Sequence, residues 1–197
     1  MLPLLLNKII QTDKLLFLHL VTQKNRIYTF LNPVSYLIAL ENKSLFEQFD
    51  GIFADGSLLV SAIRLVYGKR VTRRSFDMTS LAPELLNYLM ESRKTLYIVA
   101  SGQEQVECSV RIFQEQYPEL RIAGFRNGYF SSDAEMNKEA SHIVELNPDF
   151  LIVGMGALMQ EKFLLKVKKM GYQGIGFTCG GFVHQTAMNR MHYYPNW

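Results

Sequence analysis

Six short apolar runs of strand type recur along the chain, separated by longer segments in which apolar residues repeat with helical period. This alternation is typical of a parallel β-sheet whose strands are connected by helices. The pattern therefore predicts an α/β, Rossmann-like fold, with a mostly parallel sheet covered by helices on both faces. The predicted strands are Arg26 to Leu31, Gly51 to Ala54, Thr95 to Ala100, Arg121 to Phe125, Phe150 to Gly154 and Gly174 to Thr178.

Helical periodicity is clear between these runs. In Glu104 to Tyr117, for example, Val106, Val110 and Phe113 fall on roughly one face. A further helix is expected to start just before Pro83, because proline suits a first helical turn. The other predicted helices are Pro33 to Glu41, Ser57 to Tyr67, Asp133 to Leu146 and Gln160 to Met170.

Length and composition predict one domain over residues 1–197. The 197 residues are 48% hydrophobic and 20% charged, enough to bury a core without metals or disulfides. The two cysteines, Cys108 and Cys179, are too few for a disulfide framework or a zinc site, and they fit a reducing cytoplasm. A formal net charge of +3 is too small to argue for nucleic acid as a partner.

No apolar stretch approaches the roughly 20 residues needed to cross a bilayer. The apolar start, Leu2 to Ile10, lacks a basic leader and is not a convincing signal peptide. Contact with a membrane surface remains open, because that start is apolar and a basic cluster follows later. The cluster consists of Lys69, Arg70, Arg73 and Arg74.

Asp55 is the first candidate for catalysis. It ends a short apolar run and stands directly before Gly56. Because the carboxyl ends of parallel strands line the ligand crevice of an open α/β sheet, an acid there is a candidate general base. The alternative is that Asp55 caps the helix that follows, and one residue could do both.

Three glycine turns follow predicted strands, and each can bring backbone N–H groups close to a phosphate. Any one alone is more simply a turn former, and the first lacks the full dinucleotide fingerprint. Three turns at one edge of a sheet favour a nucleotide pocket. Their glycines are Gly102, then Gly154 and Gly156, then Gly180 and Gly181.

Polar side chains near these turns have two interpretations each. Arg73 or Arg74 can hold a diphosphate or be solvated surface. Gln160 can hydrogen-bond a sugar hydroxyl or a phosphate, whereas the neighbouring Glu161 reads as a solvated helix charge. Tyr129 can stack on a base or pack in the core.

His184 follows the third glycine turn and can line the same pocket. The alternative is a structural histidine with a satisfied hydrogen-bonding environment. Because no second histidine or acid at metal spacing accompanies it, no metal site is predicted.

Several short motifs occur in a characteristic order, and together they resemble the WecG/TagA/CpsF family of bacterial glycosyltransferases from Thr29 to the end. The motifs are Phe53-Ala54-Asp55-Gly56, Tyr117-Pro118, Gly124 with Gly128-Tyr129-Phe130, Asn147-Pro148-Asp149, Val153-Gly154-Met155-Gly156 with Gln160-Glu161, and Pro195-Asn196-Trp197. The resemblance implies an inverting enzyme without metal or cofactor. Such an enzyme moves N-acetylmannosamine or a related sugar from a UDP donor to an undecaprenyl-diphosphate-linked amino sugar, in surface polysaccharide or teichoic acid synthesis.

The resemblance also implies roles for particular residues. It places the catalytic aspartate on Asp55, a strand-end pair on Thr29 and Asn32, and a substrate-binding glutamine on Gln160. The pocket arginine falls on Arg73 or Arg74. The strand-end pair is one residue further apart here than the family pattern has it, and the arginine region lacks the usual glycine.

Relatives continue beyond the position of Trp197 through a segment rich in aromatic and basic residues, which the resemblance links to membrane binding. We therefore expect the protein to lie at the cytoplasmic face of the plasma membrane. We also expect it to form a homo-oligomer. In the 197-residue chain, donor binding should survive better than catalytic turnover. Two other classes compete with this prediction. They are a non-catalytic nucleotide-sugar-binding protein and an NAD-dependent oxidoreductase, the latter disfavoured by the incomplete fingerprint.

Overall fold

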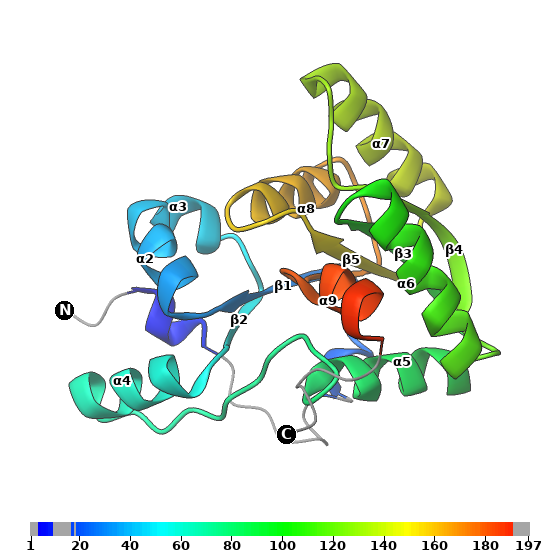
Figure 1. The fold of residues 1–197 in the computed structure, drawn as a ribbon. Helices are drawn as coiled ribbons and strands as arrows, with labels where there is room; N and C mark the ends of the chain where they lie inside the picture. The colour runs from blue at the N-terminus through cyan, green and yellow to red at the C-terminus, as the bar shows by residue number, and fades with distance from the viewer. Residues whose placement is uncertain (1–3, 10–16, 18, 191–197) are drawn as a thin grey trace.

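The computed structural model describes residues 4–9, 17 and 19–190, and these form one six-stranded sheet in the order β2-β1-β6-β5-β3-β4 (Figure 1). Every strand pair is parallel, so the predicted α/β, Rossmann-like class is confirmed. Two strand boundaries move by one residue, at the end of β4 and the start of β6. The strands are β1 (Arg26–Leu31), β2 (Gly51–Ala54), β3 (Thr95–Ala100), β4 (Arg121–Arg126), β5 (Phe150–Gly154) and β6 (Ile175–Thr178).

Helices cover both faces of the sheet, as predicted. One face carries α5 (Leu81–Glu91), α6 (Gln103–Gln116) and α9 (Phe182–Asn189). The opposite face carries α7 (Asp133–Leu146) and α8 (Met159–Lys169). Around the β1–β2 end lie η1 (Leu4–Asn7), α2 (Pro33–Glu41), α3 (Lys43–Phe46) and α4 (Ser57–Tyr67). None of the helices in the described part of the chain has the length and apolar content needed to cross a bilayer.

The strands read as continuous apolar runs because both of their faces are buried. On β3, Leu96 and Ile98 pack toward α5 and α6, whereas Tyr97 and Val99 pack toward α7 and α8. All five residues of β5 are buried in the same way. The two cysteines are free, as expected, so burial of apolar side chains is what holds the sheet and its helices together.

The chain leaves neighbouring strands toward opposite faces. After β5 it enters α8, whose Phe163 packs on the α7 face, whereas after β6 it enters α9, whose Phe182 packs on the α6 face. Loops that diverge in this way open a crevice at the carboxyl ends of the strands. The fold therefore places a ligand-binding crevice over the ends of β5 and β6.

Candidate functional site

Two adjoining cavities open at the carboxyl ends of the strands. The smaller has a volume of about 220 Å³ and the larger about 760 Å³. They share Ala157, Gly180 and Gly181 in their linings. A ligand can therefore occupy both at once, with one part in each cavity.

Asp55 lines the smaller cavity, one residue beyond the end of β2. Its backbone N–H donates to the carbonyl of Leu31 at 2.8 Å, which extends the β1–β2 pairing to this position. The helix N-cap is Gly56, with φ of 86°, so the interpretation of Asp55 as the cap is wrong. The carboxylate therefore remains available to the cavity.

Burial raises the pKa of the Asp55 carboxyl above its usual range, because a half-buried carboxylate is poorly solvated. The positive charge of Arg73 and the N–H of Gly56 lower this pKa in part, and the nearby Asp77 carboxylate raises it further. A cavity-lining carboxyl with a raised pKa has the properties of a general base or acid.

The two candidate arginines have different partners. Arg73 lies 3.5 Å from the Asp77 carboxylate, and its charge acts on Asp55. Arg74 is 9% exposed and forms an ion pair with Glu84 on α5 at 2.9 Å. Neither arginine is among the residues that line the two cavities. Of the two, Arg73 is the one whose charge acts on Asp55, whereas Arg74 ties its segment to α5.

Gln160 lines the smaller cavity and holds its wall together. Its side-chain Oε1 accepts the backbone N–H of Gly180 at 3.1 Å, and its Nε2 donates to Glu161 Oε1 at 2.9 Å. The second oxygen of Glu161 accepts the N–H of Leu158 at 2.7 Å. The amide of Gln160 is thus fixed between the start of α8 and the third glycine turn.

Glu161 is the residue of the candidate site that the sequence interpretation missed. It is 1% exposed rather than solvated, and burial raises its pKa, while hydrogen bonds from Gln160 and Thr29 partly offset the rise. A usable signal was present, because Glu at the third position of a helix commonly reaches back to the N-cap N–H, here that of Leu158.

Thr29 is completely buried in β1 and lines neither cavity. Its Oγ1 donates to Glu161 Oε1 at 2.8 Å and lies 2.8 Å from the hydroxyl oxygen of Thr178. The structure therefore places this predicted catalytic residue beneath the site, in contact with a residue that holds Gln160.

Asn32 lines the smaller cavity and is the N-cap of α2. Its Oδ1 accepts the N–H groups of Val34 and Ser35 at 3.0 and 2.9 Å. The side-chain oxygen of Asn32 is therefore committed to the cap, which leaves its amide N–H groups as the donors that a ligand can use.

The three glycine turns meet around the larger cavity. Gly156 and Gly180 have φ of 83° and 53°, a region that favours glycine. A Cβ on Gly154 would lie 2.6 Å from the carbonyl oxygen of Gly180, so the second and third turns approach closely. Gly102 and Gly181 complete the glycine lining.

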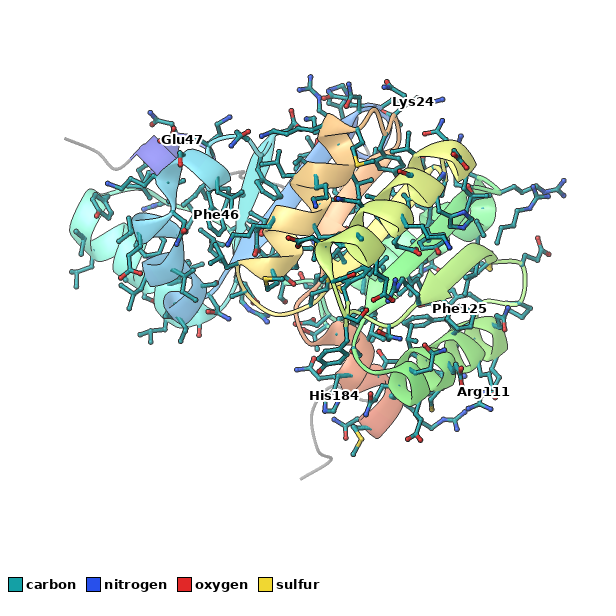
Figure 2. The ribbon with its side chains drawn as sticks, turned by 90° about the horizontal axis from the view of Figure 1, so that it is seen from above. Lys24, Phe46, Glu47, Arg111, Phe125 and His184 are labelled. Carbon is teal, nitrogen blue, oxygen red and sulfur yellow. The ribbon has the colours of Figure 1, made fainter. Side chains whose placement is uncertain are left out.

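Tyr129 and His184 lie at the rim of the larger cavity. Tyr129 is 75% exposed, so its interpretation as a core residue is wrong, and its ring is open to a flat ligand. The neighbouring Phe130 takes the packing role, with its ring 5.3 Å from that of Phe163. His184 is exposed on the first turn of α9, at the end of the molecule opposite Lys24 (Figure 2).

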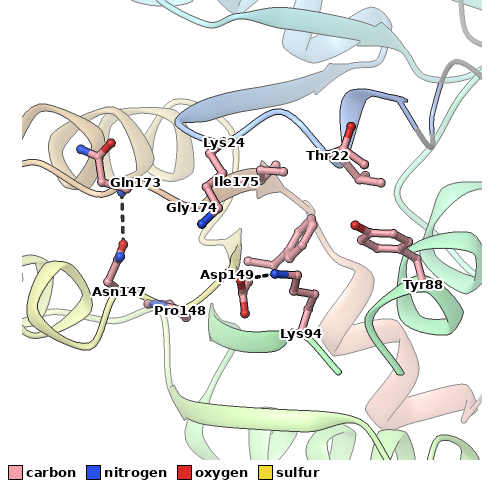
Figure 3. A pocket seen from close by; sticks show the side chains of 12 residues that line it. Thr22, Lys24, Tyr88, Lys94, Asn147, Pro148, Asp149, Gln173, Gly174 and Ile175 are labelled. Atoms are coloured by element: carbon pink, nitrogen blue, oxygen red, sulfur yellow. Dashed lines mark hydrogen bonds and ion pairs between the residues drawn. The ribbon is translucent and has the colours of Figure 1, made fainter. Parts of the chain in front are cut away.

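A third cavity, of about 260 Å³, lies at the amino ends of the strands, away from the site (Figure 3). Lys24, Lys94 and Asp149 contribute to its lining, and Lys94 pairs with Asp149 at 3.0 Å. It contains none of the predicted site residues. Within the described residues, no three His, Cys, Asp or Glu side chains gather as metal ligands would.

These observations define an α/β protein with two adjoining cavities at the carboxyl edge of a parallel sheet. Residues 10–197 match the model of the glycosyl transferase WecG/TagA/CpsF family. The chain therefore belongs to this family, and the resemblance noted in the sequence is confirmed.

Curated relatives carry related names. The chain is 33% identical over 169 residues to a UDP-Gal:alpha-D-GlcNAc-diphosphoundecaprenol beta-1,4-galactosyltransferase of Shigella boydii, covering 86% of this chain and 70% of the relative. It is 24% identical over 168 residues to an N-acetylglucosaminyldiphosphoundecaprenol N-acetyl-beta-D-mannosaminyltransferase of Bacillus subtilis (strain 168), covering 83% and 63%. This chain thus spans 63–70% of the length of these two relatives.

Proposed function

We propose that this chain transfers a hexosyl group from a UDP-sugar to an amino sugar carried on undecaprenyl diphosphate, in the synthesis of a cell-envelope polysaccharide. The observation that carries the proposal is the position of Asp55, in a small cavity that joins a larger one lined by three glycine turns. The names of both relatives support the acceptor, because each specifies N-acetylglucosamine on diphosphoundecaprenol.

In this proposal the larger cavity holds UDP. The exposed ring of Tyr129 stacks on the uracil, as aromatic side chains do on bases. The glycine turns present N–H groups to the diphosphate, and Arg73 adds a positive charge near the leaving group. The sugar then extends into the smaller cavity, past the shared Gly180 and Gly181 toward Asp55.

The chemical step is one displacement at the anomeric carbon. Asp55 takes the proton of the acceptor hydroxyl as that oxygen bonds to the anomeric carbon. The bond from this carbon to the phosphate oxygen breaks at the same time, and its electron pair leaves with UDP. Because attack is opposite the leaving group, the anomeric configuration inverts. Arg73 and the turn N–H groups stabilise the charge that develops on UDP, so we propose that no metal is required.

The donor sugar is N-acetylmannosamine or a related hexose. The two relatives point to different donors, since one is named for galactose and the other for N-acetylmannosamine. Gln160 and Asn32 line the smaller cavity, where this sugar would lie. These two side chains are therefore the expected readers of the sugar hydroxyls.

The test is transfer from a panel of UDP-hexoses to an N-acetylglucosaminyl-diphospho-lipid, with products identified by mass spectrometry. We expect one donor to give a product of acceptor mass plus one hexosyl residue, and Asp55→Asn to abolish it. The metal-independence proposal is tested with EDTA, and activity lost to EDTA and restored by magnesium would overturn it. Retention on immobilised NAD but not on UDP would overturn the whole assignment.

A further inference from the structure

The outward face of α4 is apolar. Leu58, Leu65 and Val66 are 70%, 88% and 67% exposed, and Ala62 between them is also exposed. Ala62 follows Leu58 by four residues, and Leu65 and Val66 follow Ala62 by three and four, so the four positions form one stripe along the helix. The inward face, through Leu59 and Ile63, is already packed in the core. The apolar stripe therefore remains exposed in the folded chain.

This stripe lies in a segment of unbalanced charge. Residues 56–76 contain no Asp or Glu, so the segment has a formal charge of +5, although the whole chain has only +3. Arg64 is exposed on α4 itself, and Figure 1 shows α4 at the β2 edge of the sheet, on the side away from α7. The basic residues of the segment are Arg64, Lys69, Arg70, Arg73 and Arg74.

We propose that the outward face of α4, with Arg64 and Lys69 beside it, binds the surface of an anionic lipid bilayer. An amphipathic helix with an exposed apolar stripe and flanking cations lies in the membrane interface, with the apolar side chains in the headgroup boundary. With 11 residues, α4 is about 16 Å long, too short to span a bilayer. It therefore lies along the surface.

Charge also decides between a lipid surface and a second copy of the chain. A two-fold symmetric contact would bring the same face of each copy together. Arg64 and Lys69 of one copy would then lie near the same two residues of the other across an apolar contact, and the like charges would repel each other. An anionic bilayer has the opposite charge and an apolar interior, so it complements both features of the surface.

The position of α4 links this surface to the candidate site. The role of this link in presenting the acceptor rests on the proposed function. The helix begins two residues after Asp55 and directly after Gly56. A molecule bound through α4 therefore holds its smaller cavity close to the bilayer. An acceptor sugar on a lipid diphosphate is presented at the same level, just outside the headgroups.

The test is co-sedimentation with vesicles of phosphatidylcholine containing 30% phosphatidylglycerol, without donor or acceptor. We expect Leu58→Gln with Leu65→Gln to lower the partition coefficient at least tenfold, and Arg64→Gln with Lys69→Gln to lower it severalfold. The matched controls are Leu146→Gln with Met170→Gln, and Lys162→Gln with Lys169→Gln. The first pair removes two exposed apolar groups, 42% and 41% exposed, and the second removes two exposed lysines, all outside α4. Both pairs should leave the partition coefficient unchanged.

Two results would overturn the inference. One is equal loss of vesicle binding in the α4 variants and the controls. The other is unchanged vesicle binding in α4 variants that turn an oligomer into a monomer by light scattering, which would make α4 a contact between copies. Transfer to a water-soluble short-chain acceptor is measured in parallel. Its absence in wild type would count against the proposed function alone, because vesicle binding does not depend on it.

Discussion

The side-chain Oε1 of Gln160 accepts the backbone N–H of Gly180 at 3.1 Å, across 20 residues of sequence. This hydrogen bond joins the start of α8 to the glycine turn shared by the two cavities. Gln160 is 5% exposed, so its amide is held in place, and Gly180 has φ of 53°, a backbone angle that favours glycine. The conformation of the turn therefore depends on both residues. The wall between the two cavities depends on this contact.

Replacing Gln160 by leucine should weaken catalysis and stability together. The change leaves the N–H of Gly180 without its acceptor and removes one of the donors to Glu161 Oε1, at a cost of about 1–3 kcal/mol. We expect kcat/KM for the UDP-sugar to fall by about tenfold to a hundredfold. Gln48→Leu is the control, because this exposed side chain donates to the Ser44 carbonyl and lines neither cavity, and it should retain wild-type kinetics. Unaltered kinetics in Gln160→Leu would contradict the assignment.

Thr29 is expected to act as a positioning residue, through Glu161. Thr29→Val removes the hydroxyl that donates to the Glu161 carboxylate, whereas Thr29→Ser keeps it. We therefore expect kcat to fall by about tenfold in the valine variant, equivalent to about 1.4 kcal/mol, and to change little in the serine variant. Steady-state kinetics with saturating donor separates kcat from KM. Equal kcat values in the two variants would argue against this role.

Asp55 should control the acid side of the pH–rate profile. Because burial raises the pKa of its carboxyl, kcat/KM should fall as pH drops through that raised pKa, where the base becomes protonated. Asp55→Asn keeps the shape and removes the base, so turnover should fall by about 10²–10⁴-fold at neutral pH. A variant with the wild-type profile would show that another group accepts the proton.

The same carboxyl should reduce stability at neutral pH. A folded-state pKa above the unfolded value means that the folded form holds its proton more tightly, so stability falls as pH rises through the interval between the two. Asp55→Asn should therefore unfold at higher urea concentration than wild type at pH 7. Each unit of raised pKa is equivalent to about 1.4 kcal/mol, and the difference should shrink at pH 3.

Asp50 should have the opposite effect on stability from Asp55, because its pKa is lowered rather than raised. Burial alone would raise the pKa of this carboxyl, but hydrogen bonds from Lys168, the Ile27 N–H and Arg26 lower it below its usual range. Its contribution to stability is present above the ordinary pKa and is lost as pH falls through the lowered one. Asp50→Asn should therefore destabilise the protein by about 1–3 kcal/mol at pH 7. Urea unfolding of wild type and both variants at pH 7 and pH 3 measures the two stability effects.

The strands were predictable from the sequence because local composition determines them. A strand buried on both faces must be apolar throughout, and Phe150–Gly154 is recognisable for that reason. The location of Asp55 at a cavity was predictable too, because the carboxyl ends of parallel strands line the ligand crevice. The helix starts at Gln103 and Met159 were each missed by one residue, because N-cap geometry depends on backbone angles that composition does not specify.

The partners of the site residues were not predictable in the same way. Thr29 and Glu161 are 132 residues apart, so nothing local reveals that they share a hydrogen bond. The choice between Arg73 and Arg74 depends on Glu84, which reaches one of them from a separate helix. Burial of a charged residue depends on tertiary contacts. For that reason the sequence identified candidate groups, while the structure distinguished their contacts.

Tyr129 offers a test of the nucleotide site that does not disturb the fold. Its ring is 75% exposed at the rim of the larger cavity, so its removal should leave the free energy of unfolding within about 0.5 kcal/mol of wild type. If the ring stacks on the uracil, Tyr129→Ala should weaken UDP binding by about 1–3 kcal/mol, whereas Tyr129→Phe should bind UDP as wild type does. Calorimetry with UDP measures both variants. Equal weakening in the two would mean that the hydroxyl, rather than the ring, contacts the nucleotide.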